Sequence, residues 1–149
     1  MRLTDALKGE HGAMNPLLAL IQERSEGSTL QELRMMAACL ESVLISHADL
    51  EDAILRPPIE EHLPLPAPNP DGTPGPTDHQ VIRLLLTGAL VATDPEEARR
   101  FLLRTIEETH KHFEKEETKI FAISEREVSV QAQEDQGREW ARRRGVQLK

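Results

Sequence analysis

Cysteine, aromatic residues and long apolar runs are all scarce in this sequence of 149 residues. Cys39 is the single cysteine, so no disulfide can form within the chain and no oxidising compartment is required. No apolar run approaches the roughly 18 residues that a membrane-spanning helix needs. The N-terminal segment MRLTDALKGEHG lacks the apolar stretch of a signal peptide. We therefore expect a cytoplasmic protein with no membrane partner.

The charge balance and the low aromatic content narrow the class of protein further. The formal net charge is −8, which argues against a nucleic-acid partner held by a broad basic surface. With three phenylalanines, one tryptophan and no tyrosine, the core must consist of Leu, Ile, Val, Met and Ala. Most of these residues favour helices. A chain of this length suits a single domain with a core of its own.

Apolar residues recur at helical spacing in four stretches, each bounded by capping residues or prolines. These stretches cover residues 4–24, 28–56, 77–92 and 95–124. Pro16 should kink the first helix just after His11, because a proline removes one backbone hydrogen bond. Short loops join the first helix to the second and the third to the fourth. The pattern predicts an all-α fold, an up-down-up-down antiparallel four-helix bundle.

Two segments lie outside these predicted helices. Residues 57–76 contain eight prolines and are typical of an irregular connection, and connections of this length are often functional. Residues 125–149 are polar, and a short amphipathic helix is expected around Glu134–Arg144, with Trp140 docked on the bundle. We therefore predict a bundle domain over residues 1–124 and a C-terminal extension over residues 125–149.

Two histidine–glutamate pairs with the same spacing occur on the predicted second and fourth helices. Glu51 follows His47, and Glu116 follows His112, each four residues later. On a helix this spacing places both side chains on one face, with Cβ atoms about 5–6 Å apart. An imidazole and a carboxylate on one face can bind one metal ion or two adjacent ions.

Two further histidines, His11 and His79, lie alone on the predicted first and third helices. A single histidine on an apolar helix face is usually a core residue with satisfied hydrogen bonds. In an antiparallel bundle, however, these histidines and both pairs fall within roughly one to two helical turns of one another along the axis. Buried carboxylates in such a layer would be costly unless they were paired or coordinated.

We therefore predict a metal centre with four nitrogen and two oxygen ligands. The predicted ligands are His11, His47, Glu51, His79, His112 and Glu116. Such a ligand set suits non-haem iron, with manganese and zinc as competitors.

With these residues in this order, the sequence resembles the haemerythrin-like (HHE cation-binding) domain family over roughly residues 4–124. The segments HADLEDAILRP and HFEKEETKIFA look like the ligand segments of that family. The resemblance implies a four-helix bundle that holds two non-haem iron ions. The implied ligands are His11 and His47 for one iron, His79 and His112 for the other, and Glu51 and Glu116 as bridges between both.

One position differs from the oxygen-carrying haemerythrins, which have a further histidine four residues from the ligand on the third helix. Here Arg83 stands four residues after His79, and Gly75 stands four residues before it. The set of four histidines and two glutamates resembles instead the iron–sulfur repair and nitric-oxide-responsive members. His62, in the proline-rich connection, could fold back as a replacement ligand; the simpler interpretation is a solvated loop histidine.

Other polar residues near the ligands are interpreted as bystanders. Asp52, Glu114 and Glu117 are expected on a solvated face, and His110 is expected to point outward. Cys39 is expected to pack in the core rather than take part in redox chemistry.

Three functions are compatible with this centre. The main hypothesis is a di-iron protein that binds or senses oxygen, or a related small ligand such as nitric oxide, at an open iron position. The alternative is a redox enzyme or iron–sulfur repair-type protein acting on peroxide or nitric oxide, so the sequence does not decide whether the protein is an enzyme. The third is a structural metal domain that docks an unknown protein partner through residues 125–149.

Overall fold

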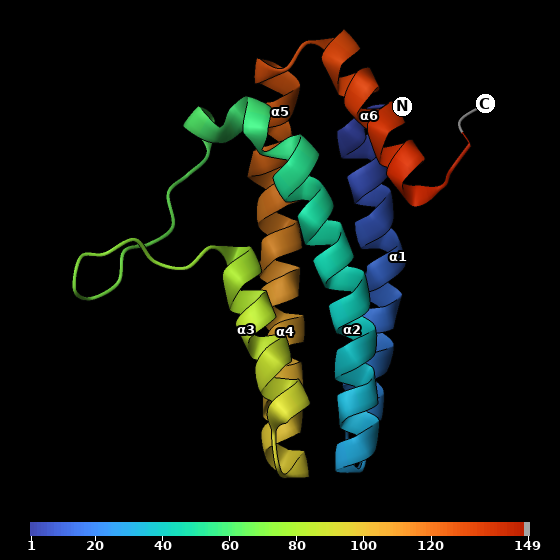
Figure 1. Cartoon of the computed structure of the whole chain (residues 1–149), viewed down its shortest axis with the longest axis vertical. Helices are drawn as coiled ribbons and strands as arrows, with labels where there is room; N and C mark the ends of the chain where they lie inside the picture. The colour runs from blue at the N-terminus through green and yellow to red at the C-terminus, as the bar shows by residue number, and fades with distance from the viewer. Residues whose placement is uncertain (148–149) are drawn as a thin grey trace.

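The computed structural model describes residues 1–147, and over that range it is helical with no β-strand, which confirms the expected all-α class. Four helices run side by side along the long axis of the molecule (Figure 1). They are α1 (Leu3–Arg24), α2 (Leu30–Leu50), α3 (Asp78–Val91) and α4 (Pro95–Lys115). The other elements are η1 (Glu51–Leu55), η2 (Pro57–His62), η3 (Glu116–Ile120), α5 (Phe121–Glu127) and α6 (Val130–Arg144).

Side-chain caps begin three of the four helices near the places that the sequence predicts. At α2, the Thr29 hydroxyl accepts the backbone N–H of Glu32, and the Glu32 carboxylate accepts that of Thr29. Thr77 and Gln80 form the same reciprocal pair at α3. Asp94 accepts a backbone N–H at the start of α4. Each such cap typically contributes roughly 1 kcal/mol, so the helix starts are fixed locally.

Two π-helical segments interrupt what the sequence predicts to be continuous α-helices. The segment η1 follows α2 at Glu51, and η3 follows α4 at Glu116. The backbone N–H of Arg56 bonds to the carbonyl of Glu51, and that of Phe121 bonds to the carbonyl of Glu116, each five residues back. Such wide turns are rare and are often found at functional sites. Both begin at the glutamate of a histidine–glutamate pair.

The apolar core consists of two clusters separated by a polar layer. The larger cluster includes Leu18, Leu40, Leu86 and Leu102, one from each of the four helices. The smaller cluster joins the start of α1 to η1, η2, η3 and α5, and its buried members include Leu7 and Phe121. All the predicted metal ligands lie between these clusters along the helices. Their layer is therefore sealed by apolar side chains above and below.

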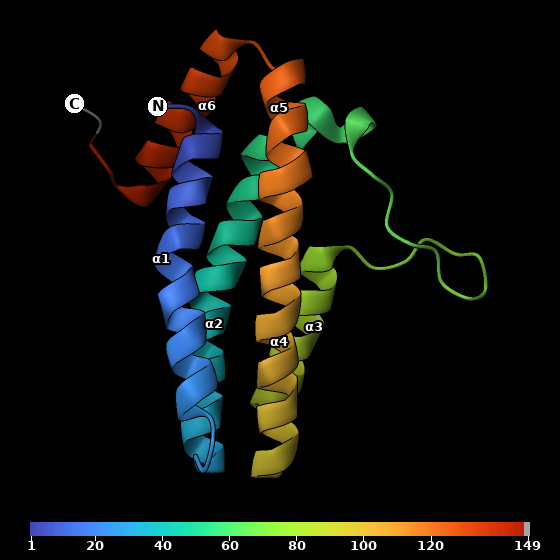
Figure 2. The ribbon, with the colours of Figure 1, turned by 180° about the vertical axis from the view of Figure 1, so that it is seen from behind.

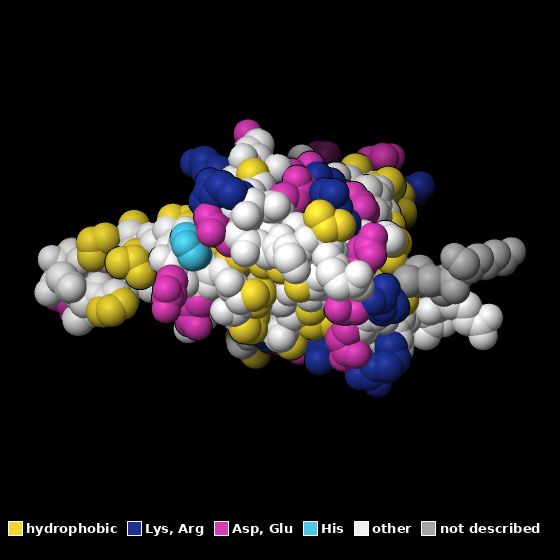
Figure 3. All heavy atoms as spheres, turned by 90° about the horizontal axis from the view of Figure 1, so that it is seen from above, with side chains coloured by type: hydrophobic (Ala, Val, Ile, Leu, Met, Phe, Trp, Pro, Cys, Tyr) yellow, Lys and Arg dark blue, Asp and Glu magenta, His cyan; other side chains and the backbone are white. Residues whose placement is uncertain are grey.

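The connections lie at opposite ends of the molecule. The α1–α2 and α3–α4 loops share one end, and the proline-rich connection leaves from the other half (Figures 1 and 2). This connection is not irregular throughout, since it begins with the 3-10 helix η2. It then projects from the body, with hydrophobic side chains gathered on its surface (Figure 3); Leu65 is 92% exposed.

The C-terminal helix α6 is longer than the sequence indicated and lies against α1 near the N-terminus (Figures 1 and 2). Gly137 permits this approach, because a Cβ atom there would clash with the backbone carbonyl of Met1. None of the helices within residues 1–147 combines the length and the apolar character needed to cross a membrane.

The core can be tested by truncating one fully buried leucine. Leu86 is completely inaccessible, whereas Leu84 on the same helix is 72% exposed. Leu86→Ala is expected to lower the free energy of unfolding by about 2–5 kcal/mol, because it leaves a cavity in the larger cluster. Leu84→Ala should change it by less than about 0.5 kcal/mol. Urea denaturation of both variants in a chelating buffer measures the difference, and equal effects would contradict this packing.

Candidate metal centre

All the predicted ligands meet at one level of the bundle. They form two groups, His11, His47, Glu51 and Glu116 in the first, and His79, His112, Glu51 and Glu116 in the second. Within each group, one ligand atom from every residue lies within 4.8 Å of the others. None of these residues is more than 6% exposed. The two groups share both glutamates, so they describe two adjacent positions, either of which could hold a metal ion.

The histidines face each other in two pairs through their Nε2 atoms. His11 Nε2 lies 3.1 Å from His47 Nε2, and His79 Nε2 lies 3.0 Å from His112 Nε2. Metal–nitrogen bonds of 2.0–2.1 Å would place two ligands at right angles about 3 Å apart. Each pair therefore has the separation of two neighbouring ligands of one ion.

The two glutamates reach both histidine pairs. Glu51 Oε1 lies 3.1 Å from His47 Nε2, and Glu51 Oε2 lies 3.3 Å from His79 Nε2. Glu116 Oε2 is 3.4 Å from the Nε2 atoms of both His11 and His112. Both oxygens of Glu51 and Oε2 of Glu116 are buried without a hydrogen-bond partner. Buried carboxylate oxygens left unpaired are costly, and a cation between these side chains would remove that cost.

Each histidine also faces a carboxylate behind it, on its Nδ1 side. The contacts are Glu10 with His47 at 2.6 Å, Glu117 with His11 at 2.8 Å, Asp52 with His79 at 3.0 Å and Asp78 with His112 at 3.6 Å. A carboxylate can only accept, so the Nδ1 atoms of His11, His47 and His79 carry a proton, whereas Asp78 lies beyond hydrogen-bond distance of His112 Nδ1. In the neutral imidazole the Nε2 lone pair is then free and points toward the partner histidine, which is the arrangement of a metal-binding imidazole.

These four outer carboxylates follow a regular pattern. Each is the direct neighbour of a predicted ligand in the sequence, as Glu10 is of His11 and Asp52 is of Glu51. Each faces the histidine of the next helix in chain order. Glu117, which follows α4, completes the ring by contacting His11 of α1. Adjacent residues lie about 100° apart around a helix, so the neighbour of an inward ligand faces the adjoining helix.

The sequence interpretation missed this outer ring. Asp52 and Glu117 were expected on a solvated face, and their side chains are indeed 46% and 44% exposed, yet each contacts a buried histidine. The signal was present in the sequence, because Glu10 and Asp78 also adjoin predicted ligands. All four predicted ligand segments have an acidic residue next to a ligand. This pattern becomes visible only when the four segments are compared with one another.

The buried carboxylates attract positive charge to this layer. Burial lowers the pKa of His47, but contacts with Glu10 and Glu51 outweigh it and raise the pKa to about 9. Burial likewise opposes the contacts of His112 with Asp78 and Glu51, which raise its pKa to about 10. Although burial acts in the other direction, three histidines hold the pKa of Glu51 well below its usual value. Without a metal, protons supply the positive charge.

Glu116 behaves differently from Glu51. Burial, together with repulsion from the Glu51 carboxylate, raises its pKa. The positive charge near the two glutamates therefore favours ionisation of Glu51 but does not also favour ionisation of Glu116. A divalent ion at either position would stabilise both in their ionised form.

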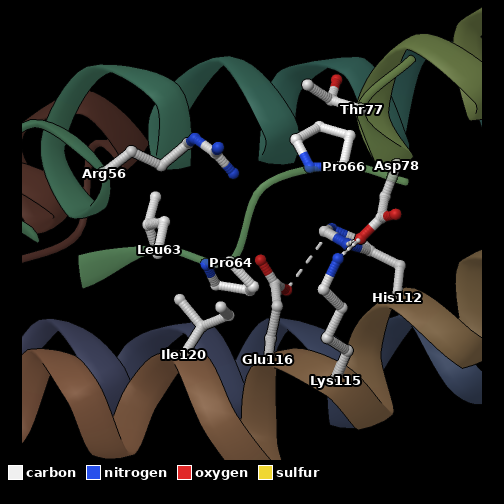
Figure 4. A pocket seen from close by; sticks show the side chains of 10 residues that line it. All are labelled: Arg56, Leu63, Pro64, Pro66, Thr77, Asp78, His112, Lys115, Glu116 and Ile120. Carbon is white, nitrogen blue, oxygen red and sulfur yellow. Dashed lines mark hydrogen bonds and ion pairs between the residues drawn. The ribbon is translucent and has the colours of Figure 1, made fainter. Parts of the chain in front are cut away.

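Several cavities adjoin the layer, and two of them are lined by more than one predicted ligand. One, of about 40 Å³, opens beside His112 and Glu116, with Arg56 and Lys115 on its walls (Figure 4). Leu63, Pro64 and Pro66 of the proline-rich connection form another wall of this cavity. The second, of about 10 Å³, lies on the other side of the layer. Its lining is His47, His79 and His112 together with Leu44, Ile45, Ala48, Ile82, Thr109 and Phe113.

The remaining sequence candidates lie away from this centre. His62 is 45% exposed and faces Glu127 at 3.6 Å, so it does not join either ligand group. Arg83, at the place of the fifth histidine in oxygen carriers, pairs at the surface with Asp49 at 2.6 Å. His110 is exposed, as expected. Cys39 is also exposed, so the expectation that it packs in the core was wrong.

Comparisons of this chain with protein-family models, with curated proteins and with solved structures found no match. The indication that the chain could bind metal therefore comes from the buried histidine–glutamate groups. These groups are compatible with a haemerythrin-like site.

The raised histidine pKa values lead to a prediction about protons. His47 and His112, with pKa values of about 9 and 10, are protonated at pH 7 in the metal-free protein, and metal requires their neutral forms. Metal binding at pH 7 should therefore release about two protons per chain. Because protons compete below these pKa values, the apparent affinity should rise with pH until about pH 10. Calorimetry in buffers of different ionisation enthalpy counts the protons, and a release near zero would contradict the assignment.

Proposed function

We propose that this chain is a haemerythrin-like, non-haem di-iron protein that binds or senses oxygen or a related diatomic ligand. The observation that carries the proposal is the sharing of Glu51 and Glu116 between two pairs of histidines. In this proposal the bundle has up-down-up-down antiparallel topology. His11 and His47 would hold one iron, His79 and His112 would hold the other, and Glu51 and Glu116 would be shared between the two positions.

The donor set supports two ions of iron better than one of zinc. Structural zinc sites are closed and tetrahedral, usually with cysteine, whereas Cys39 is exposed and belongs to neither ligand group. Four imidazoles and two carboxylates suit iron, with manganese as the nearest competitor. Two histidines and two shared carboxylates leave positions on each ion for an external ligand.

The residues of the chain would position and shield that ligand. When bound, the iron pair supplies redox chemistry and an open coordination position. Glu117, Glu10 and Asp52 hold the imidazoles of His11, His47 and His79 with Nε2 directed inward. Leu44 and Phe113 give the smaller cavity an apolar wall beside the histidines, which favours a small neutral molecule over an ion.

A second candidate function is reduction of peroxide or nitric oxide, or iron–sulfur repair. Two observations favour it over reversible oxygen carriage. Arg83 replaces the additional histidine of oxygen carriers and lies at the surface. The cavity of about 40 Å³ brings Arg56 and Lys115 near His112 and Glu116, so polar molecules can approach the centre from solvent.

Metal content and oxygen reactivity test the main proposal together. Anaerobic protein reconstituted with Fe²⁺ is expected to hold two irons per chain, because two ligand groups are present. Exposure to oxygen should then change the visible spectrum. His62→Ala serves as the control, since His62 lies outside both groups and should leave the spectrum unchanged. One zinc per chain with no uptake of iron would refute the di-iron assignment.

Substitution of the ligands should remove metal and the stability that metal provides. His47→Ala and Glu116→Ala are expected to lose bound iron, while Glu114→Ala, at an exposed position two residues from Glu116, should keep it. An ion present at a hundred times its Kd stabilises a fold by about 2.7 kcal/mol. The free energy of unfolding, measured with and without iron, should show that gain in Glu114→Ala but not in the other two. Equal behaviour of all three variants would mean that the helix faces are wrongly assigned.

A further inference from the structure

One outer carboxylate, that of Glu10, is clamped by the C-terminal helix α6. Its Oε1 accepts hydrogen bonds from Trp140 Nε1 at 2.8 Å and from Arg144 Nε at 2.6 Å. Its Oε2 contacts His47 Nδ1 at 2.6 Å and accepts a second bond from Arg144 at 3.1 Å. Arg144 also donates to the hydroxyl of Ser46, next to His47. Because both oxygens of Glu10 accept hydrogen bonds from α6, the plane of the carboxylate that contacts His47 is fixed.

The other three outer carboxylates are held less firmly. Glu10 is 16% exposed, compared with 41% for Asp78, 46% for Asp52 and 44% for Glu117. The Glu10–His47 contact of 2.6 Å is the shortest of the four, and the Asp78–His112 contact of 3.6 Å is the longest. Lys115 binds the same Asp78 oxygen at 2.6 Å. Water therefore screens Asp52 and Asp78, which face His79 and His112, more than it screens Glu10, which faces His47.

Packing of α6 on the bundle does not by itself require the hydrogen bonds that Trp140 and Arg144 donate to Glu10. Trp140 already packs against the smaller apolar cluster through its ring. Its N–H nevertheless meets the one carboxylate that also holds His47. On the same helix, the side-chain partner of Arg142 and Arg143 among residues 1–147 is Glu139, at the exposed surface. Arg144 thus differs from its neighbours in reaching across to α1 and α2.

We propose that Trp140 and Arg144 are positioning residues for the metal position of His11 and His47, acting through Glu10. By fixing Glu10, they hold the His47 imidazole in the tautomer and orientation that bind metal. A ligand held in place before the ion arrives loses less freedom on binding, so this position is the tighter of the two. The inference rests on the proposed two-metal centre and adds that α6 makes its halves unequal.

A stepwise titration with Co²⁺ as the probe metal tests this inference. Metal-free wild-type protein should bind two Co²⁺ in two resolved calorimetric steps. Trp140→Phe keeps an aromatic ring, though a smaller one, and removes the N–H, and Arg144→Gln removes the guanidinium group. Each is expected to weaken the tighter step by roughly 10-fold, within the range seen for residues that support metal ligands, and to leave the weaker step unchanged.

Two further variants serve as matched comparisons. Asp78→Asn should weaken only the second step, because Asp78 faces His112. Arg143→Gln, on α6 but bound only to Glu139, should change neither step. If Trp140→Phe and Arg144→Gln weaken both steps equally, or neither, the inference is wrong. If wild-type protein binds fewer than two Co²⁺, the two-metal centre itself fails, and the inference fails with it.

A variant that moves α6 without changing a charge provides an independent check. Gly137→Val places a side chain against the Met1 carbonyl and should push α6 away from α1. It is expected to weaken the tighter step at least as much as Trp140→Phe, with the second step as the internal control. Circular dichroism establishes that each variant is folded. A folded Gly137→Val protein with an unchanged first step would overturn the role of α6.

Discussion

Two carboxylates buried in the middle of a helical core are the constraint on which the rest of this structure depends. Glu51 and Glu116 are at most 3% exposed, and each lies within reach of imidazoles from both histidine pairs. Such groups cannot remain ionised in a dry core without nearby positive charge. His47 and His112 supply it as protons in the absence of metal, or the four histidines hold an ion that supplies it. Both the raised histidine pKa values and the unpaired oxygens follow from this single requirement.

The backbone adapts to the same constraint. The polar layer divides the core into two apolar clusters, and both π-helical turns begin where the layer meets the smaller one. A wide turn changes the register between a ligand pair and the apolar residues that follow it. After Glu51 the residues Ile54 and Leu55 are buried, and after Glu116 the same holds for Ile120 and Phe121. The turns thus allow one helix to present ligands and then close the core above them.

Much of this arrangement could be predicted from local patterns. The spacing of His47 and Glu51 fixes a common helix face, and helix lengths set by caps such as Thr77 place His79 at the same height. The π-helical turns could not be predicted, because hydrophobic periodicity over five residues does not distinguish a wide turn from an ordinary one. The outer carboxylates were missed because half-exposed acids look alike in sequence, whether or not they reach a histidine. Only the packing of neighbouring helices separates Asp52, which touches His79, from Glu114.

The outer ring also explains how so many acids can surround one centre. Three of the four outer carboxylates have a cationic partner within 4.0 Å, namely Arg144 for Glu10, Arg56 for Asp52 and Lys115 for Asp78. The side chains of these cations are 24–39% exposed, compared with at most 4% for those of Glu51 and Glu116, so they offset the charge of the outer carboxylates from the edge of the layer. The outer acids can then orient imidazoles without adding their full repulsion to the inner pair. The charge of Glu51 and Glu116 is left to be balanced from within the layer, where the histidines and any bound ion lie.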